Sequence, residues 1–377
     1  MHKVGIVGYY QVKPDLDMKM SQYEMDFTAV RGALDYANLK RDDITTVVGV
    51  NNDYYDGKTI SNCFKVESGG AYMKDETKVE MDGAHGLMYG LWRILSGNHN
   101  LAVIYGTSMP SCFPYESTRV LENDPTFDRQ INLLNSYTTG AMQMRAYMHN
   151  FGVSKEVIAK MAVSNYKNAA KNPLALSEAQ KSGITVEDVL ESDYLSSPLR
   201  ELMYPILCDS CSVVIIAPER LALKITDNPV WITGVGHNND TYYIGDRDLS
   251  TSKSMERASK KAYEMANIRD PKKEIDVAEI FGHTACEDLI LSEAAKLAEK
   301  GKGVELVDKE ILNPSGGTMA GYTPCANGLT RIIEAAKQIR GEAEGHQVSG
   351  AKRAIASGQV GFCAQNNIIF VLEGGAA

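Results

Sequence analysis

The sequence has no long hydrophobic run: among its 377 residues, no stretch approaches the roughly 18 apolar residues of a membrane-spanning helix. The N-terminus also lacks the charged and then apolar pattern of a secretory signal, and its first apolar run, Val4–Val7, is typical of a buried strand. These two absences predict a cytoplasmic protein. The length, with 44% hydrophobic residues, allows one large α/β domain or two smaller ones.

An excess of positive charge is also absent. The chain carries 39 Lys and Arg residues against 48 Asp and Glu residues, which gives a net charge of -9. Because nucleic-acid backbones are bound by clustered Lys and Arg, this balance argues against a general nucleic-acid binder. It still allows a small basic pocket for a phosphorylated cofactor.

Cysteine is present, but its number and spacing fit neither a disulfide framework nor a zinc site. The seven cysteines are scattered, and in a chain without an export signal they predict reduced thiols. Cys208 and Cys211 form a C-x-x-C pair, but a strand at Val213–Ile216 follows it instead of the helix of a redox motif. We interpret the pair as small buried residues at a strand entrance, and we expect no metal in this chain.

The two halves of the chain resemble each other in the order of their elements. The matching pairs are Gly5–Gly8 with Ile232–Gly236, Ala33–Leu39 with Ala262–Ile268, Ile44–Val50 with Ile275–Phe281, the helix begun by Gly86-Leu87 with that begun by Gly328-Leu329, and the strand Leu101–Tyr105 with Ile368–Leu372. Repeated matches in one order predict a duplicated α/β unit with mixed sheets covered by helices. We assign residues 1–107 and 200–228 to the N-terminal half and residues 229–377 to the C-terminal half.

The stretch between the halves, residues 108–199, is rich in Tyr, Met and Asn and is expected to form an inserted loop domain. Its pattern predicts helices at Ser136–Asn150 and Ser154–Lys171. Ser154 is a plausible N-cap, and Glu156 falls in the first turn, where the helix dipole favours an anion. This insertion could cover a substrate entrance, form a dimer contact, or be an ordinary helical layer.

A polar, glycine-containing turn at residues 82–86 leads directly into an amphipathic helix, and with other motifs it resembles the thiolase superfamily. The resemblance extends over essentially the full length and is strongest to the sterol-carrier-protein-type and archaeal thiolases. It implies the thiolase fold, in which duplicated βαβαβαββ-type halves form a five-layer αβαβα sandwich, and it implies a homodimer. The residues that carry it are Val79-Glu80 with Gly83–Gly86, Pro205–Ser210, Ala278–Ile280, Asn313–Gly317 and Gly321–Gly328.

The chain departs from the thiolase pattern at the positions on which the family's chemistry depends. The family's nucleophilic cysteine at a helix N-terminus is Gly83 here, and its Gly-His-Pro turn reads Gly321-Tyr322-Thr323-Pro324. The position of a further family His or Asn is Phe281. Cys363 is a candidate for the cysteine of the family's last glycine loop. Thiolysis through residue 83 is therefore physically impossible.

Four side chains remain as catalytic candidates: Tyr322, His283, His85 and Cys363. Tyr322 stands where the resemblance places the general base, although a free phenol, with a pKa near about 10, is a better acid than base; it could also simply pack on a turn. His283 is predicted on the loop after a strand that lines the family's pocket. His85 could reach a substrate carbonyl or cap its helix, and Cys363 could shuttle protons or fill the core.

Small residues are candidates for binding the substrate and its CoA group. Gly83 lies in a turn that keeps the glycines and helix N-terminus of an oxyanion site. Ser315, Gly316 and Gly317 offer unobstructed N–H groups, or form a tight turn. Cys325, three residues after Tyr322, is a fallback nucleophile.

The resemblance favours retro-aldol cleavage of a β-hydroxyacyl-CoA, the reaction of a superfamily subset that lacks the cysteine. Those lyases resemble this chain in the tyrosine at position 322, and they typically carry a second tyrosine where Phe281 stands. The reaction needs a base for the β-hydroxyl proton and a hydrogen-bonded thioester oxygen. The alternatives are retro-Claisen cleavage of a β-ketoacyl-CoA, with another thiol or direct attack by CoA, and a non-catalytic subunit of a heteromeric complex.

Coenzyme A is implied as part of the substrate thioester. The resemblance also implies a small partner protein with a zinc ribbon and an OB-like domain. The acyl group is not specified by the sequence, although Tyr9, Tyr10, Tyr54 and Tyr55 hint at an aromatic or bulky acyl pocket.

Overall fold

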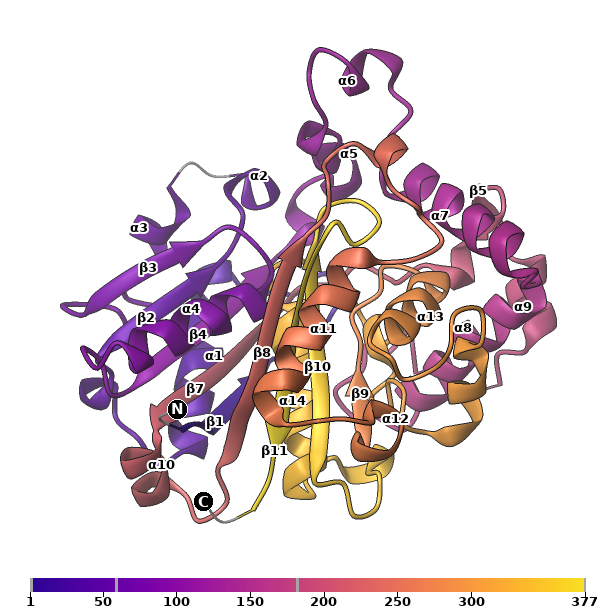
Figure 1. Ribbon diagram of the computed structural model, residues 1–377. Coiled ribbons are helices and arrows are strands. Elements are labelled where there is room, and N and C mark those ends of the chain that lie inside the picture. Colours follow the sequence, from indigo (N-terminus) through magenta and orange to yellow (C-terminus); the bar gives the residue numbers. More distant parts are fainter. Residues whose placement is uncertain (1–2, 58–59, 181–182, 376–377) are drawn as a thin grey trace.

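The computed structural model describes residues 3–57, 60–180 and 183–375, and Figure 1 shows a mixed α/β molecule built on one large sheet. The nine-stranded sheet has the order β3-β2-β4-β7-β1-β8-β11-β10-β9. The strands are β1 Val4–Gln11, β2 Thr46–Val50, β3 Asp75–Val79, β4 Ala102–Ser108, β7 Ser210–Pro218, β8 Val230–Asn239, β9 Val277–Glu279, β10 Arg353–Val360 and β11 Asn366–Glu373.

The strand order is mirrored about the pairing of β1 with β8. In the N-terminal half, β7 pairs antiparallel with both β1 and β4, and β2 pairs parallel with both β4 and β3. In the C-terminal half, β11 pairs antiparallel with both β8 and β10, and β10 pairs parallel with β9. The expected duplication is therefore confirmed. The counterpart of β4 is β10, which lies between β9 and β11 as β4 lies between β2 and β7, so the sequence match of Leu101–Tyr105 with Ile368–Leu372 is wrong.

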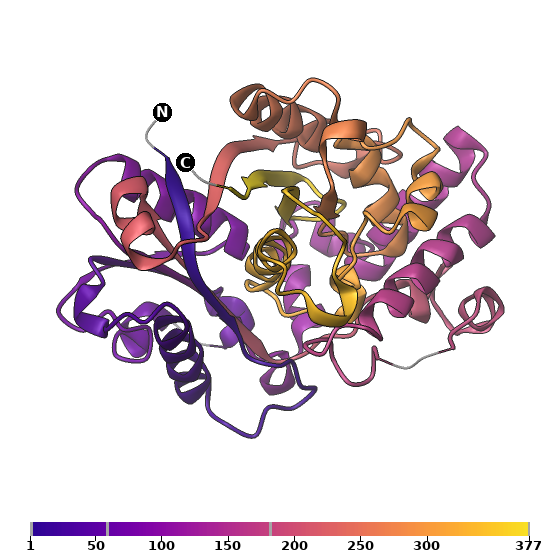
Figure 2. The same ribbon diagram turned by 90° about the horizontal axis from the view of Figure 1, so that it is seen from below.

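Four long helices complete a five-layer arrangement: α1 (Gln22–Tyr36), α4 (Gly83–Leu95), α11 (Lys253–Ala266) and α14 (Asn327–Arg340). Helix α1 packs on one face of the N-terminal strands and α4 on the other; α14 packs on α4 and on the C-terminal strands, which α11 covers from outside. Figure 2 shows α14, in gold, near the centre of the molecule. The thiolase-like αβαβα sandwich expected from the sequence is confirmed.

The alternation of side chains along the strands explains these layers. On β2, Val47 packs into the core under α1, while the next residue, Val48, packs into the core under α4. On β4, Val103 and Ile104 divide in the same way. Because both faces of the sheet are covered, the inner strands β2 and β4 are continuously buried and do not alternate between buried and exposed residues.

The stretch 108–199 supplies helices that border the C-terminal half in Figure 1. Helices α7 and α8 agree with the predicted ranges to within one or two residues, and both pack against α13. Ser154 is the N-cap of α8, but its side chain accepts no capping hydrogen bond. The elements of this stretch are α5 Tyr115–Arg119, α6 Asp128–Ile131, α7 Ser136–Phe151, α8 Lys155–Ala169, α9 Val186–Glu191, β5 Tyr194–Ser196 and β6 Leu199–Arg200. The division of the chain into units stays a prediction.

Shorter elements connect these layers. They are α2 Asp53–Asp56, α3 Ser61–Lys65, α10 Glu219–Ile225, α12 Pro271–Glu274 and α13 Ala285–Ala294, with 3-10 turns η1 Arg41–Asp43, η2 Pro110–Cys112, η3 Val120–Glu122, η4 Glu201–Met203, η5 Ile244–Asp246, η6 Gly303–Lys309, η7 Gly317–Ala320 and η8 Glu344–His346. None of the helices in the described ranges is both long and apolar enough to cross a membrane.

Candidate active site

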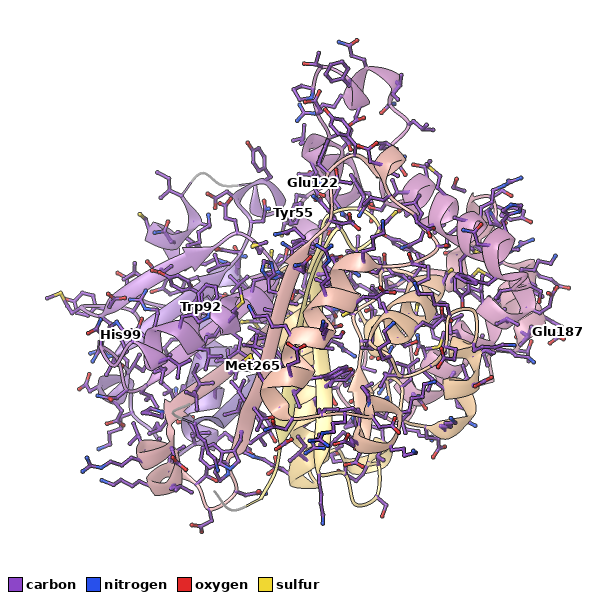
Figure 3. All side chains as sticks on the ribbon, viewed as in Figure 1. Tyr55, Trp92, His99, Glu122, Glu187 and Met265 are labelled. Atoms are coloured by element: carbon purple, nitrogen blue, oxygen red, sulfur yellow. The ribbon has the colours of Figure 1, made fainter. Side chains whose placement is uncertain are left out.

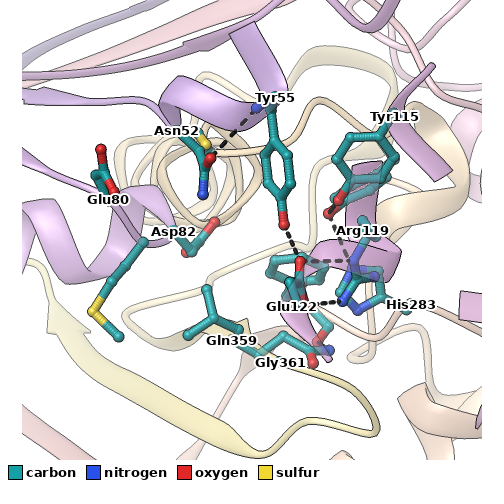
Figure 4. A pocket seen from close by; sticks show the side chains of 15 residues that line it. Asn52, Tyr55, Glu80, Asp82, Tyr115, Arg119, Glu122, His283, Gln359 and Gly361 are labelled. Atoms are coloured by element: carbon teal, nitrogen blue, oxygen red, sulfur yellow. Dashed lines mark hydrogen bonds and ion pairs between the residues drawn. The ribbon is translucent and has the colours of Figure 1, made fainter. Parts of the chain in front are cut away.

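A cavity of about 200 Å³ lies where the turns before α4 and α14 meet the end of β10 and the segment that contains α5 and η3 (Figure 4). Among the candidates from sequence, Tyr322, His283 and Cys325 line it, and so does Tyr55. The full lining is Asn52, Tyr55, Glu80, Met81, Asp82, Tyr115, Arg119, Glu122, Phe281, His283, Tyr322, Cys325, Gln359, Val360 and Gly361.

Backbone pairing fixes Tyr322 in the cavity wall. Its N–H donates to Ile206 O at 2.9 Å, and its carbonyl accepts from Cys208 N–H at 3.0 Å. The preceding Gly321 has φ +133°, a conformation that favours glycine. The tyrosine ring is thereby held in the wall, with only 4% of its surface exposed.

The Tyr322 hydroxyl lies within hydrogen-bonding distance of two other side chains. It is 2.8 Å from the Tyr115 hydroxyl and 3.0 Å from His283 Nε2. Burial, together with the nearby Tyr115 phenol, raises the pKa of Tyr322 well above its ordinary value. The phenol is therefore protonated at neutral pH. It can accept a proton from a substrate only if it passes its own proton to a neighbouring group at the same time.

His283 is such a neighbour, because a buried carboxylate faces its other ring nitrogen. His283 Nδ1 lies 3.7 Å from Glu287 Oε2, and Glu287 also accepts the His283 backbone N–H at 2.6 Å. Burial opposes ionisation of Glu287, but His283 and a hydrogen bond from Gln359 outweigh it and lower the pKa of that carboxyl below its usual value. The result is a connected carboxylate, imidazole and phenol, with the proton-accepting end in the cavity.

A second polar group in the wall comes from residues 108–199. The Arg119 guanidinium contacts Glu122 at 3.1 Å, and the Tyr55 hydroxyl donates to the same carboxylate; Figures 3 and 4 both show Tyr55 next to Glu122. Burial disfavours the Glu122 anion, but Arg119 and Tyr55 lower its pKa below the ordinary value. Sequence reasoning missed this buried group, because the contact between Tyr55 and Glu122 joins residues 67 positions apart in the chain.

The aromatic wall also explains how a second phenol reaches Tyr322. Phe281 occupies the position where the resembling lyases carry tyrosine, and its ring centroid lies 5.7 Å from that of Tyr322. Tyr115 packs in the same cluster as Phe281 and Tyr322, and its hydroxyl supplies the second phenol beside Tyr322. Sequence reasoning missed Tyr115, since it lies 207 residues from Tyr322 and belongs to no motif.

Gly83 lies just outside the lining, and it has no space for a side chain. A Cβ there would stand 2.6 Å from Leu329 Cγ and 3.0 Å from the carbonyl oxygen of Cys325. The place expected for a nucleophile is therefore filled by a leucine of α14. Its neighbour Asp82 lines the cavity instead, and the binding role expected for Gly83 stays a prediction.

The Asp82 carboxyl is held between the N-termini of α4 and α14. One oxygen accepts the Ala84 N–H at 3.0 Å and the other accepts the Gly328 N–H at 2.8 Å. Burial raises the pKa of Asp82 to about 7, against the lowering effect of these N–H groups. The sequence contained Asp82 within the recognised turn, but the turn alone did not indicate that the carboxyl faces the cavity.

His85 does not reach the cavity, contrary to the prediction. Its Nε2 lies 2.8 Å from Asn366 Oδ1, and its ring packs edge-on against His237. Burial lowers the pKa of His85 to about 4, so the imidazole is neutral. The helical rotation between Asp82 and His85 turns this side chain toward β11.

Cys363 and the Ser315–Gly317 turn also lie outside the cavity lining. Cys363 Sγ donates to Thr139 O at 3.4 Å in a small adjoining space that shares Arg119, His283 and Gly361 with the cavity lining, and burial raises the pKa of the thiol to about 12. Ser315 is buried and donates to Glu279 at 2.7 Å. The Gly316 N–H donates to Asn313 O at 2.9 Å and the Gly317 N–H donates to Ser315 Oγ at 3.3 Å, so both N–H groups are used within the turn.

The cysteine pair is buried, as interpreted. Cys208 and Cys211 form no disulfide, and they lie at the start of β7. Across the described ranges, no group of three or more His, Cys, Asp or Glu side chains is arranged to hold a metal ion.

Comparisons with known proteins agree with this fold. Residues 236–373 match the family model "Thiolase C-terminal domain-like". The acetyl-CoA acetyltransferase of Methanothermobacter thermautotrophicus is 27% identical over 371 residues, covering 93% of this chain and 94% of that protein. The acetyl-CoA acetyltransferase of Methanocaldococcus jannaschii is 32% identical over 218 residues, or 54% of each chain.

A solved structure shares nearly the whole architecture. The Ltp2-ChsH2(DUF35) aldolase superposes with a TM-score of 0.82 over 98% of this chain and 97% of that one, at 19% sequence identity, a likeness of fold. The family match, the full-length relative and the mirrored five-layer sandwich agree, and together they support a thiolase-like protein of the thiolase superfamily.

Proposed function

We propose that this protein cleaves the Cα–Cβ bond of a β-hydroxyacyl-CoA by a retro-aldol reaction, without an acyl-enzyme. The observation that carries the proposal is the contrast between two positions: Leu329 fills the space beside Gly83, while Tyr322 joins His283 at the cavity. The names of the relatives, acetyl-CoA acetyltransferases, support an acyl-CoA substrate. The aldolase of like fold supports the type of reaction.

The proton path begins at the substrate β-hydroxyl. With the imidazole proton on Nδ1, which faces Glu287, His283 Nε2 accepts the hydrogen bond from the Tyr322 O–H. As Tyr322 takes the β-hydroxyl proton, its own proton passes to His283, and the Glu287 carboxylate stabilises the imidazolium. The Cα–Cβ bond then breaks, an aldehyde or ketone leaves, and the thioester retains the electron pair as an enolate.

The two central helices favour this enolate. Helix α4 begins directly after Asp82, and α14 begins at Asn327, two residues after Cys325; Asp82 and Cys325 both line the cavity. The positive ends of the two helix dipoles lie near the place where negative charge develops. Coenzyme A takes part as the thioester of the substrate, and the proposed chemistry needs no metal in this chain.

Paired substrates test the proposal. The purified chain is incubated with 3-hydroxyacyl-CoA and 3-ketoacyl-CoA thioesters that have the same carbon skeletons. The assay is run with the chain alone and with the proteins encoded by neighbouring genes. We expect the hydroxy substrate alone to give a carbonyl product and a shortened acyl-CoA, with no consumption of free CoA. Cleavage of the ketone alone, with CoA consumed, would contradict the proposal. Cleavage of neither would favour a non-catalytic subunit.

A second candidate function rests on Cys325. Its position in the cavity wall provides a thiol for retro-Claisen cleavage of a β-ketoacyl-CoA, the type of acyl transfer that the acetyltransferase relatives' names indicate. We favour the retro-aldol reaction because the wall centres on Tyr322, His283 and Tyr115. A Cys325→Ser variant separates the two, since it should abolish acyl transfer and preserve aldol cleavage.

Two assemblies belong to the same proposal. Strand β3 lies at the outer edge of the sheet and, among the described residues, pairs only with β2. We therefore propose a homodimer at this edge. The name Ltp2-ChsH2(DUF35) aldolase supports a small partner protein, for which the sequence suggested a zinc ribbon and an OB-like domain. Light scattering of the chain, with and without such a neighbour, measures both.

A further inference from the structure

The Asp82 carboxyl is a feature of the cavity that the proton path through Tyr322 does not use. It forms part of the cavity wall, yet only 3% of the residue is exposed. Figure 4 draws Asp82 on one side of the pocket and Arg119 and His283 on the other. Two proton-carrying groups thus flank the space that a substrate would occupy.

The surrounding backbone leaves room for this carboxyl and for little else. A Cβ on Gly328, at the start of α14, or on Gly358, in β10, would overlap the Asp82 carboxyl oxygen. The hydrogen bonds from Ala84 N–H and Gly328 N–H fix the orientation of the group. Asp82 is therefore a rigid, enclosed carboxyl in the wall of the cavity, and not a surface cap of the helix.

We infer that Asp82 is the acid–base residue at the substrate Cα, where it delivers a proton to the enolate that carbon–carbon cleavage leaves behind. This inference rests on the proposed function. Tyr322 and His283 thus take the proton from the β-hydroxyl on one side of the cavity. Asp82 adds the proton at Cα from the other side. In the step, the Asp82 O–H bond breaks, a Cα–H bond forms, the enolate returns to a thioester, and Asp82 is left as a carboxylate that solvent or His283 reprotonates.

The electrostatics of the site suit this role. Burial raises the pKa of Asp82 to about 7, so both protonation states are populated near neutral pH. The positive charge of Arg331 on α14 lowers this pKa, while His85 on α4 is neutral because burial lowers its own pKa to about 4. Cys325 and Glu80 are the other ionisable groups beside it in the cavity wall, and the adjacent end of β10 carries no charged side chain.

Cys325 is the rival for this role, because its thiol lines the same wall. Conservative variants of Cys325 and Asp82 remove different chemical groups. Cys325→Ser keeps size but loses the acidic thiol, whereas Asp82→Asn keeps an oxygen for the Ala84 N–H but loses the transferable proton. These two variants therefore separate the alternatives.

Hydrogen exchange at Cα tests the inference apart from bond cleavage. Propionyl-CoA is incubated in D2O with the complete protein, together with any partner it needs, and deuterium at Cα is followed by mass spectrometry. We expect exchange with the wild type, a fall of at least about 100-fold in Asp82→Asn, and exchange retained in Tyr322→Phe and in Cys325→Ser. Exchange that depends on Asp82, with no cleavage of any hydroxyacyl-CoA, would reject the proposed function and leave Asp82 as the acid–base residue at Cα in a different reaction.

Three results would overturn the inference: no exchange in the wild type, wild-type exchange in Asp82→Asn, or exchange lost in Cys325→Ser. Thermal unfolding of each variant establishes that it is folded. The wild type gives a measurement that needs no variant: its exchange rate should rise through a pKa of about 7 and level off above it, because the carboxylate removes the Cα proton in the reverse step. A rate that is constant across this pKa would also contradict the inference.

Discussion

The turns before α4 and α14 occupy equivalent places in the two halves, and they differ in what they bring to the cavity. The turn before α14 presents Tyr322 and Cys325, whereas the turn before α4 presents the carboxyl groups of Asp82 and Glu80. Leu329 of α14 fills the place beside Gly83. The N-terminal half thus lacks the nucleophile at Gly83, and a side chain of the C-terminal half, Leu329, fills the space. Each half still supplies an acid–base group, Asp82 from one and Tyr322 from the other.

The largest expected effect comes from the turn before α14. Tyr322→Phe removes the hydroxyl that contacts His283, and we expect kcat for retro-aldol cleavage to fall by about 10²–10⁴-fold. Tyr115→Phe is the matched control, since it removes a neighbouring phenol that has no contact with His283, and it should cost less. Rates measured with one hydroxyacyl-CoA check both. Wild-type activity in Tyr322→Phe would show that the Tyr322 hydroxyl takes no part in the reaction.

The turn before α4 should resist restoration of a thiol. Gly83→Cys places a Cβ against Leu329, so we expect a loss of about 1–3 kcal/mol in the free energy of unfolding and no gain of acyl transfer. Denaturant unfolding and a thiolysis assay measure these. Gly83→Ala is the control for bulk alone, and Leu329→Ala should relieve part of the loss in the double variant. A stable, acylated Gly83→Cys protein would show that the site is open.

A smaller effect on kcat is expected from Glu287, which contacts His283 and not the substrate. Glu287→Gln keeps the shape of the side chain but removes the negative charge that faces His283 Nδ1. The imidazolium formed during cleavage then loses its partner, and kcat should fall about tenfold, equivalent to about 1.4 kcal/mol, with KM little changed. A change in KM alone would indicate a structural role for this carboxylate.

The smallest effect concerns stability near the turn before α4. Because burial raises the pKa of Asp82 to about 7, its contribution to stability is complete below the pKa of the unfolded chain and is lost as the pH rises through about 7. The melting temperature of the wild type should therefore fall relative to that of Asp82→Asn over this range. A difference that is independent of pH would mean that the carboxyl titrates normally.

The sequence predicted the parts of this site that lie in local motifs. The duplicated fold, Tyr322 in its turn and His283 after β9 all follow from patterns within short segments. Tyr115 and Glu122 could not be predicted, because only the folding of residues 108–199 over the cavity brings them into its wall. His85 was misplaced for a related reason: its position in the first turn of α4 was clear, but the face toward Asn366 depends on how the helix packs.

The account's central claim is that carbon–carbon cleavage proceeds with no covalent acyl intermediate. Intact-mass spectrometry of the protein, quenched during turnover of a cleaved hydroxyacyl-CoA, tests it most directly. We predict that every observed mass corresponds to the unmodified chain, in the wild type and in Cys325→Ser alike. An acyl adduct in the wild type that is lost in Cys325→Ser would contradict the claim and assign the chemistry to the Cys325 thiol.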